Sequence, residues 1–187
     1  MLFKFKSEIE QYKKQYSTEY VLFEELGPQA KKNGFLTQEE FLKICLWKTP
    51  RAKKKYLDNT KETIEKTTKK AFAETNEIKK IQTLCKLNGV GIPVASAILT
   101  VINPKKYGVI DIRCIQTLKE NGYEKEFPNK SISEKRWKRY VEILNELSKN
   151  FNCKPREVEM AIFAKNREDH PENLYKDKTK AGKIAKI

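Results

Sequence analysis

The stretch LCKLNGVGIPVASAIL, residues 84–99, predicts two short helices joined by a tight turn. Gly89 and Gly91 suit such a turn, because glycine adopts positive φ angles at no steric cost and lets another group approach the backbone. Val90 has an apolar side chain that would fill the gap between the helices, and the small Ala95 lets the helix backbones come close. The stretch therefore predicts a helix–turn–helix unit at the centre of the fold.

Outward from this turn, the chain is predicted to be helical nearly throughout. Strand-like alternation is absent, and the seven glycines and seven prolines fall mostly at the ends of periodic apolar segments. Two helix starts carry the capping-box pattern, one at Thr37 with Glu40 and one at Ser131 with Glu134. We therefore expect an all-α fold, a compact helical bundle that contains the predicted helix–turn–helix.

The length of 187 residues is sufficient for one sizeable hydrophobic core. We expect a single all-helical domain over residues 1–165, either undivided or formed by two small lobes with a cleft between them. Its first amphipathic stretch runs through Ile9, Tyr12 and Tyr16. Residues 166–187 are polar and rich in lysine, and they predict a basic, loosely ordered tail.

The charge of the chain favours a polyanionic partner. Lys and Arg number 39 against 25 Asp and Glu, which gives a formal net charge of +14. The excess is not evenly spread, and residues 51–80 carry ten basic and five acidic groups. Arg51, Lys53, Lys54 and Lys55 form a candidate phosphate-facing surface, although a solvated helix face would have the same composition.

The four cysteines, Cys45, Cys85, Cys114 and Cys153, are at least 29 positions apart, so they do not predict a zinc or iron–sulfur site. Buried free thiols in a reducing cytoplasm explain them most simply. The sequence also has no apolar run of about 18 residues and no signal-peptide pattern. We therefore expect a cytoplasmic protein with no membrane partner, associated with the nucleoid in a bacterium or archaeon.

The predicted turn resembles the helix-hairpin-helix motif of DNA repair proteins. In that motif, backbone N–H groups at the turn and at the start of the second helix point outward and bind phosphate. Gly89, Val90 and Gly91 would supply these groups, and Lys86 would add a charge beside them. The alternative is a glycine-rich turn inside a helical bundle that binds nothing.

The resemblance extends further along the chain. Residues 87–91 together with Val109-Ile110-Asp111-Ile112-Arg113 are similar to the core signature of the helix-hairpin-helix DNA glycosylase superfamily, which includes endonuclease III. The resemblance implies that Asp111 is the catalytic carboxylate. It also implies that no cofactor is required, and that a monovalent cation, K⁺ or Na⁺, can bind at the hairpin through the main-chain carbonyls of Cys85, Leu87 and Val90.

Two departures from the family pattern restrict the implied chemistry. Members that cleave the DNA backbone place a lysine two residues beyond the second hairpin glycine, where this chain has Pro93. The iron–sulfur cysteines of some members are also missing. The resemblance therefore implies a monofunctional enzyme that hydrolyses the N-glycosidic bond without a lysine Schiff base.

Asp111 has a structural interpretation beside the catalytic one. A carboxylate directly before an apolar-periodic segment is commonly a helix N-cap. The catalytic interpretation requires the carboxylate to face a pocket, where it could stabilise positive charge on the deoxyribose or orient a water. The two interpretations are compatible, because a cap also fixes the position of the carboxylate.

An extruded base needs flat side chains to stack on. Trp47 and Tyr107 are the candidates for the base pocket, whereas Trp137 and Tyr140 lie at helical core spacing and are interpreted as packing residues. Arg113 could hold a phosphate of the DNA or pair with a nearby carboxylate, and the sequence leaves both open.

Three functions remain open from the sequence. The first is a monofunctional DNA glycosylase that acts as a monomer on double-stranded DNA. The second is a helix-hairpin-helix module that binds DNA without chemistry. The third is a helical domain that binds RNA or protein, supported by charge alone.

Overall fold

The structure, a computed structural model, describes residues 19–128 and 131–171. Within these residues it contains helices and no strand, so the predicted all-α class is confirmed. None of the helices found there is long and apolar enough to cross a membrane. The first predicted amphipathic stretch, Ile9 to Tyr16, and residues 172–187 of the predicted tail lie outside the described residues.

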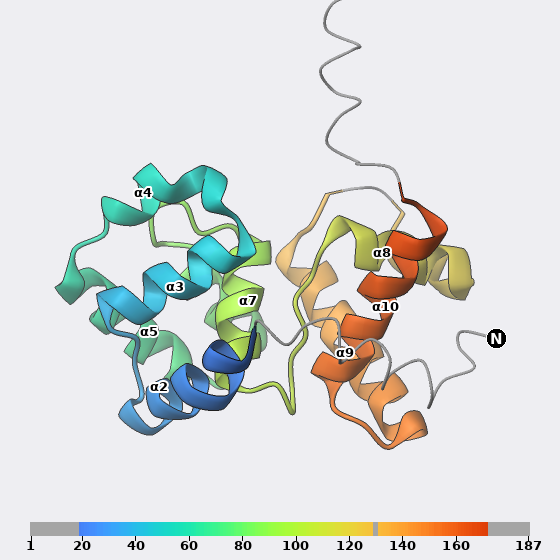
Figure 1. Cartoon of the computed structure of the whole chain (residues 1–187), viewed down its shortest axis with the longest axis horizontal. Coiled ribbons are helices and arrows are strands. Elements are labelled where there is room, and N and C mark those ends of the chain that lie inside the picture. Colours follow the sequence, from blue (N-terminus) through green and yellow to red (C-terminus); the bar gives the residue numbers. More distant parts are fainter. Residues whose placement is uncertain (1–18, 129–130, 172–187) are drawn as a thin grey trace, which may run out of the picture.

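The helices form two groups, with one segment of chain running between them (Figure 1). The first lobe contains eight elements: the π-helical η2 (Val21–Leu26), α2 (Gly27–Asn33), α3 (Gln38–Lys48), the 3-10 turn η3 (Pro50–Ala52), α4 (Lys53–Leu57), α5 (Lys61–Ala73), α6 (Glu77–Leu84) and α7 (Ile92–Ile102). The second lobe contains five: α8 (Ile112–Leu118), the irregular turn η4 (Lys119–Tyr123), the 3-10 turn η5 (Glu124–Glu126), α9 (Glu134–Phe151) and α10 (Pro155–Asp169).

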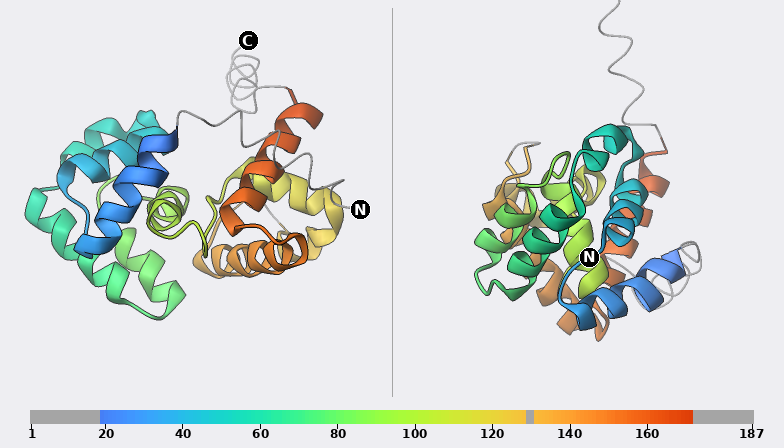
Figure 2. Two further views of the ribbon diagram at one scale, coloured as in Figure 1. Left: turned by 60° about the horizontal axis from the view of Figure 1, so that its bottom comes forward. Right: turned by 90° about the vertical axis from the view of Figure 1, so that its left-hand side faces the viewer.

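Helix α7 lies at the centre of the first lobe. Every residue from Val94 to Val101 is buried, as expected for a helix that is apolar on all sides. It packs against α3, α2 and α6, and it also contacts α9 of the second lobe. Figure 2 shows that the segment after α7 leads from the first lobe into the second.

The second lobe has its own apolar centre. Trp137 and Tyr140 of α9 are fully buried there, as predicted for packing residues. Helix α10 continues four residues beyond the predicted domain boundary at 165, and Asn166 is completely buried. The predicted start of the tail at residue 166 is therefore wrong, because the packing of α10 extends the helix into polar sequence.

One of the two predicted capping boxes is confirmed. The hydroxyl of Thr37 accepts the N–H of Glu40, and the Glu40 carboxylate accepts the N–H of Thr37. The second box is wrong, because Ser133 and not Ser131 caps α9, its hydroxyl accepting the N–H of Arg136 at 3.4 Å. Ser131 instead accepts a hydrogen bond from the guanidinium of that arginine.

Candidate functional site

Residues 85–91, the hairpin, join α6 to α7 as the sequence predicts. The turn is closed by short-range backbone bonds, with the N–H of Leu87 bound to the Leu84 carbonyl at 3.1 Å and that of Val90 to the Leu87 carbonyl at 3.0 Å. Gly91 is the N-cap of α7, and its carbonyl accepts the N–H of Ala95 at 2.9 Å. The N–H groups of Gly89 and Gly91 donate to no acceptor among the described residues.

The two hairpin glycines are needed for different reasons. Gly89 has φ +82°, and a Cβ there would come within 2.8 Å of the Tyr56 ring, so only glycine fits. Gly91 has an ordinary φ of −92°, and a Cβ there would meet only Pro93, at 3.9 Å. The fold itself therefore explains Gly89, whereas Gly91 is exposed and keeps space open in front of the first turn of α7.

A side chain from the α4–α5 connection holds the hairpin in place. The buried Asn59 amide donates to the carbonyl of Asn88 at 3.1 Å and accepts the N–H of Asn88 at 2.8 Å. The same side chain also donates to the carbonyls of Lys55 and Tyr56. The hairpin is thus fixed against α4, a contact that the sequence analysis missed because the partners are 29 positions apart.

This contact brings the basic cluster beside the hairpin. Lys53 and Lys55 belong to α4 and are exposed, and Arg51 precedes them in η3. The side chain of Lys55 lies directly against Gly89, and Lys86 is exposed on the hairpin itself. Segments that the sequence separates by about thirty residues therefore form one basic surface.

The hairpin carbonyls predicted to hold a monovalent cation retain hydrogen-bonding capacity. The carbonyl of Leu87 accepts one hydrogen bond, and those of Cys85 and Val90 accept none from the described residues. Each oxygen has two lone pairs, so all three could still ligate K⁺ or Na⁺. In residues 19–128 and 131–171, no group of three or more His, Cys, Asp or Glu side chains could hold a metal ion.

Asp111 is the N-cap of α8, as predicted. Its Oδ1 accepts the N–H of Arg113 at 2.9 Å, and its backbone is extended with φ −144°. The second oxygen, Oδ2, lies 2.8 Å from Nζ of Lys48, which comes from the last turn of α3. The two side chains are only 18% and 15% exposed, so the ion pair is largely withdrawn from solvent.

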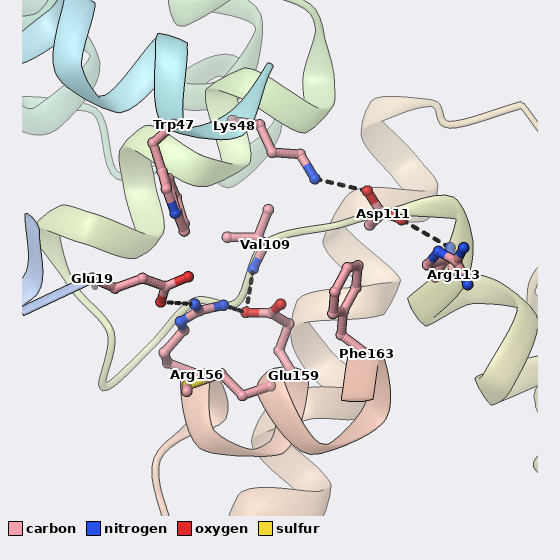
Figure 3. A pocket seen from close by; sticks show the side chains of 10 residues that line it. Glu19, Trp47, Lys48, Val109, Asp111, Arg113, Arg156, Glu159 and Phe163 are labelled. Carbon is pink, nitrogen blue, oxygen red and sulfur yellow. Dashed lines mark hydrogen bonds and ion pairs between the residues drawn. The ribbon is translucent and has the colours of Figure 1, made fainter. Parts of the chain in front are cut away.

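Asp111 and Lys48 line a cavity of about 280 Å³ between the two lobes, named here the interlobe cavity. Figure 3 shows Trp47 and Lys48 entering it from α3, and Phe163 of α10 lying opposite. Of the predicted site residues, Asp111, Arg113 and Trp47 meet here. Lys48 was missed, and the only sequence signal for it was its place directly after Trp47.

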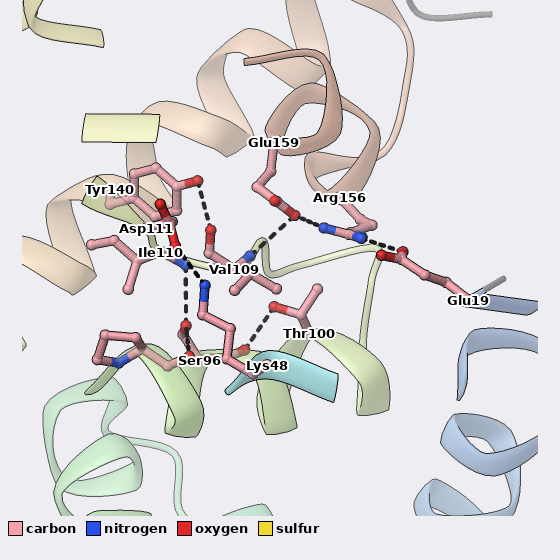
Figure 4. Close-up of polar contacts among 11 residues, drawn as sticks. Glu19, Lys48, Ser96, Thr100, Val109, Ile110, Asp111, Tyr140, Arg156 and Glu159 are labelled. Carbon is pink, nitrogen blue, oxygen red and sulfur yellow. Dashed lines mark hydrogen bonds and ion pairs between the residues drawn. The ribbon is translucent and has the colours of Figure 1, made fainter. Parts of the chain in front are cut away.

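The chain leading to Asp111 is held by buried side chains from three helices (Figure 4). The N–H of Val109 donates to Glu159 of α10 at 3.3 Å, and its carbonyl accepts the Tyr140 hydroxyl of α9 at 3.1 Å. The N–H of Ile110 donates to Ser96 of α7 at 3.1 Å. Since α7 begins at the hairpin, Ser96 fixes the distance between the hairpin and Asp111.

The back of the cavity is formed by an ionic cluster. Arg156 is 7% exposed and bridges Glu159 and Glu19, and its guanidinium lies 5.6 Å from the ring centre of Trp47. Trp47 also meets Phe23 edge to face at 5.7 Å between ring centres. Both contacts restrict the indole to one position on the cavity wall.

Two other predicted site residues have different surroundings. Tyr107 does not line the interlobe cavity, because its ring is buried, stacks on Trp137 at 6.0 Å and donates its hydroxyl to Glu77 at 2.9 Å. The prediction that it belongs to the base pocket beside Asp111 is therefore wrong. Arg113 lines the cavity and donates to Asn166 at 2.9 Å, so it also ties α8 to α10.

The groups behind Asp111 stay neutral at physiological pH. Burial, and then the charge of Asp111, raise the pKa of the Cys114 thiol to about 12. Burial likewise raises the pKa of Tyr140 well above its ordinary value. The ionisable side chains that line the cavity are Glu19, Lys48, Asp111, Arg113, Arg156 and Glu159.

No protein-family model, curated protein or solved structure matches this chain at a significant level. The similarity of residues 87–113 to the glycosylase signature therefore stays a prediction. The functional evidence is the geometry of the chain itself.

Proposed function

We propose that this protein binds double-stranded DNA and hydrolyses the N-glycosidic bond of a damaged or modified base, as a monofunctional DNA glycosylase. The observation that carries the proposal is the position of Asp111. Its carboxylate is fixed by a helix cap and opens into a cavity beside an aromatic side chain, Trp47. A carboxylate that served only as a cap would not need a cavity in front of it.

The hairpin supplies the DNA-binding half of the proposal. The N–H groups of Gly89, Gly91 and Ile92 donate to no acceptor among the described residues, and the positive end of the α7 dipole lies at the same place. Lys86 and the lysines of α4 add charge around them. A phosphate in front of Gly91 would accept hydrogen bonds from these N–H groups, while the basic surface would hold the neighbouring phosphates.

The interlobe cavity supplies the chemical half. A base extruded from the duplex would enter between Trp47 and Phe163. The carboxylate of Asp111 would then stabilise the positive charge that develops on the deoxyribose as the glycosidic bond breaks, or orient the attacking water. The bond from Ile110 to Ser96 keeps the carboxylate at a fixed distance from the hairpin that holds the DNA.

The test is base release from duplexes that carry uracil, 8-oxoguanine, alkylated or bulky modified bases, measured for the wild type and for Asp111→Asn. Asparagine caps a helix as well as aspartate does, so the variant keeps the cap and removes the charge, and urea unfolding of the variant measures what the loss of the ion pair with Lys48 does to the fold. We expect base release to fall at least about a hundredfold, with DNA affinity unchanged within about twofold. Activity retained by Asp111→Asn contradicts the mechanism.

Release of no base by the wild type, combined with salt-sensitive duplex binding, would instead favour the non-catalytic DNA-binding module. Equal binding of duplex DNA, duplex RNA and single strands would remove the duplex DNA specificity from the proposal.

One observation favours a second chemical step, cleavage of the abasic strand. Lys48 supplies a primary amine 2.8 Å from Asp111, although the hairpin position carries Pro93. After passing a proton to Asp111, this amine would attack the C1′ aldehyde of the opened abasic sugar. Asp111 returns the proton to the departing water as the imine forms, and then takes the C2′ proton while the C3′–O bond breaks and the 3′ phosphate leaves.

Borohydride trapping on a duplex that already contains an abasic site tests this step independently of base release. This second candidate function predicts a covalent adduct with the wild type and none with Lys48→Arg, which keeps the positive charge but cannot form the imine. Lys86→Arg is the control and should form the adduct normally. Absence of an adduct with the wild type would leave the protein monofunctional.

A further inference from the structure

A second cavity, of about 440 Å³, lies in the first lobe and does not share residues with the interlobe cavity. It opens to solvent and is lined by the ends of α2, α5 and α7, the start of α6 and the segment after α7. Four lysines surround it, and we name it the lysine cavity: Lys31, Lys69, Lys80 and Lys106.

The lysine cavity carries uncompensated positive charge. Lys80 and Lys106 share one carboxylate, that of Glu77, at 3.9 and 2.6 Å. Lys31 and Lys69 form no ion pair with any carboxylate of the described residues. Among the four lysines of the lysine cavity, two therefore share one carboxylate and two have none, and that carboxylate is not itself a wall of the cavity. The charge favours an anionic occupant.

The arrangement of two of these ammonium groups is fixed in advance. Glu77 also accepts the hydroxyl of the buried Tyr107 at 2.9 Å, and Lys80 donates to that hydroxyl at 3.4 Å. Lys106 lies 5.3 Å from the centre of the Tyr107 ring. Because Glu77 and Tyr107 hold both lysines, a bound anion would meet donors that need little reordering.

Besides the lysines, the lysine cavity is lined by apolar side chains and one amide. Phe72, Leu99 and Ile102 form apolar walls, which an inorganic anion would leave uncovered. The amide of Asn103 also lines the cavity and makes no side-chain hydrogen bond within the described residues. An asparagine amide can present one of its two N–H donors beside its carbonyl acceptor, the pair that matches the edge of adenine.

From these features we infer that the lysine cavity binds an adenine nucleotide, with its phosphate at the lysines and its base against the apolar walls and Asn103. The inference does not rest on the proposed glycosylase activity. The same chemistry could come from a free nucleotide or from the 5′-phosphorylated end of a DNA strand.

The test uses the two tryptophans of the chain. Trp137 stacks on Tyr107, which lines the lysine cavity, so Trp47→Phe leaves a single fluorophore next to the proposed site. Titration of this full-length variant with AMP should change the Trp137 emission and saturate. Adenosine and inorganic phosphate should each bind at least about tenfold more weakly, because adenosine lacks the contacts with the lysines and phosphate lacks those with the apolar walls and Asn103.

Matched variants locate the binding. Lys31→Ala with Lys69→Ala should weaken AMP at least about tenfold, whereas Lys32→Ala with Lys70→Ala should change it less than about twofold. The control pair removes the same charge from neighbouring exposed positions that do not line the cavity. Asn103→Ala should weaken AMP while leaving the affinity for inorganic phosphate unchanged.

Competition assigns the source. Two oligonucleotides of the same sequence, one with a 5′ phosphate and one with a 5′ hydroxyl, compete with AMP. If the phosphorylated one displaces AMP much better, the natural ligand is a strand end. If the two displace it equally, the natural ligand is a free nucleotide. The inference is overturned if AMP causes no saturable change in the wild-type cavity. It is also overturned if both lysine pairs weaken binding equally, or if phosphate binds as tightly as AMP.

Discussion

The hairpin and the interlobe cavity are built in opposite ways. The hairpin takes its shape from consecutive residues, closed by backbone hydrogen bonds between positions three apart, and one outside side chain, Asn59, holds it. The interlobe cavity is assembled from α3, the segment before α8, α10 and Glu19, and its contacts join residues up to 137 positions apart. In the hairpin the backbone faces outward, whereas in the cavity charged side chains face each other.

This difference predicts which changes each region tolerates. The stability of the hairpin should be sensitive to added Cβ atoms and insensitive to removed charge, because backbone hydrogen bonds close the turn. The interlobe cavity should be sensitive to any change that leaves one charge of a buried pair alone. The predictions below separate the two regions by stability and by binding.

The largest effect is expected for Arg156→Met. The change leaves the buried carboxylate of Glu159 without its cation, and such a loss costs about 3–5 kcal/mol. Urea unfolding followed by circular dichroism measures it. Lys43→Met, which breaks an exposed ion pair with Glu39, is the control and should barely move the midpoint.

Adding Glu159→Gln to Arg156→Met should recover part of the loss, because the more deeply buried of the two carboxylates that Arg156 pairs with is then neutral, and only that of Glu19 remains unpaired. Equal midpoints for Arg156→Met and Lys43→Met would show that the cluster behind Trp47 contributes nothing to stability.

The next largest effect is expected in the hairpin, for Gly89→Ala. The variant forces alanine into φ +82° and brings its Cβ against the Tyr56 ring, which together cost about 2–4 kcal/mol. Thermal unfolding measures the loss. An unchanged melting temperature would mean that the hairpin backbone adapts more freely than its contacts with α4 indicate.

Tyr140→Phe tests the support of Asp111 from behind. It removes the hydroxyl that binds the buried carbonyl of Val109, at an expected cost of about 1–3 kcal/mol in unfolding free energy. Base release should fall as well, because Val109 is two residues from Asp111. Tyr20→Phe, at a tyrosine that is 62% exposed, should change neither quantity.

Gly91→Ala has the smallest expected effect on stability and the clearest effect on binding. The fold has room for the Cβ, so unfolding should change by less than about 0.5 kcal/mol. Duplex affinity should nevertheless fall about tenfold, because the methyl group would occupy the place of the phosphate. Fluorescence anisotropy at two salt concentrations measures it, and unchanged affinity would remove the hairpin from the DNA-binding surface.

Much of the fold could be predicted from sequence because it depends on local patterns. The helical class, the Thr37 cap, the turn between α6 and α7 and the cap at Asp111 all follow from residues within four positions of each other. The prediction failed at Ser131, where Ser133 offered a competing hydroxyl two residues later. It also ended α10 too early, since a polar residue such as Asn166 can be buried by packing alone.

The candidate site was predicted only in part. Asp111 and Trp47 do line one cavity, but Tyr107 lines another, where its ring stacks on Trp137 and its hydroxyl donates to Glu77. Sequence proximity to Asp111 suggested Tyr107, and the turn of the chain after α7 separates the two. Asn59 and Arg156 carried no pattern that could have identified them, because their partners are distant in sequence.

The sequence by itself determined the conformation of the hairpin and the cap on Asp111, because backbone dihedral angles and short-range hydrogen bonds depend on neighbouring residues. Only the tertiary structure decided that Lys48 of α3 meets Asp111 at 2.8 Å, that Lys55 lies against Gly89, and that four lysines surround one apolar cavity. The physical reason is that these contacts are set by how the helices of both lobes pack, and packing depends on apolar surfaces spread over the whole chain.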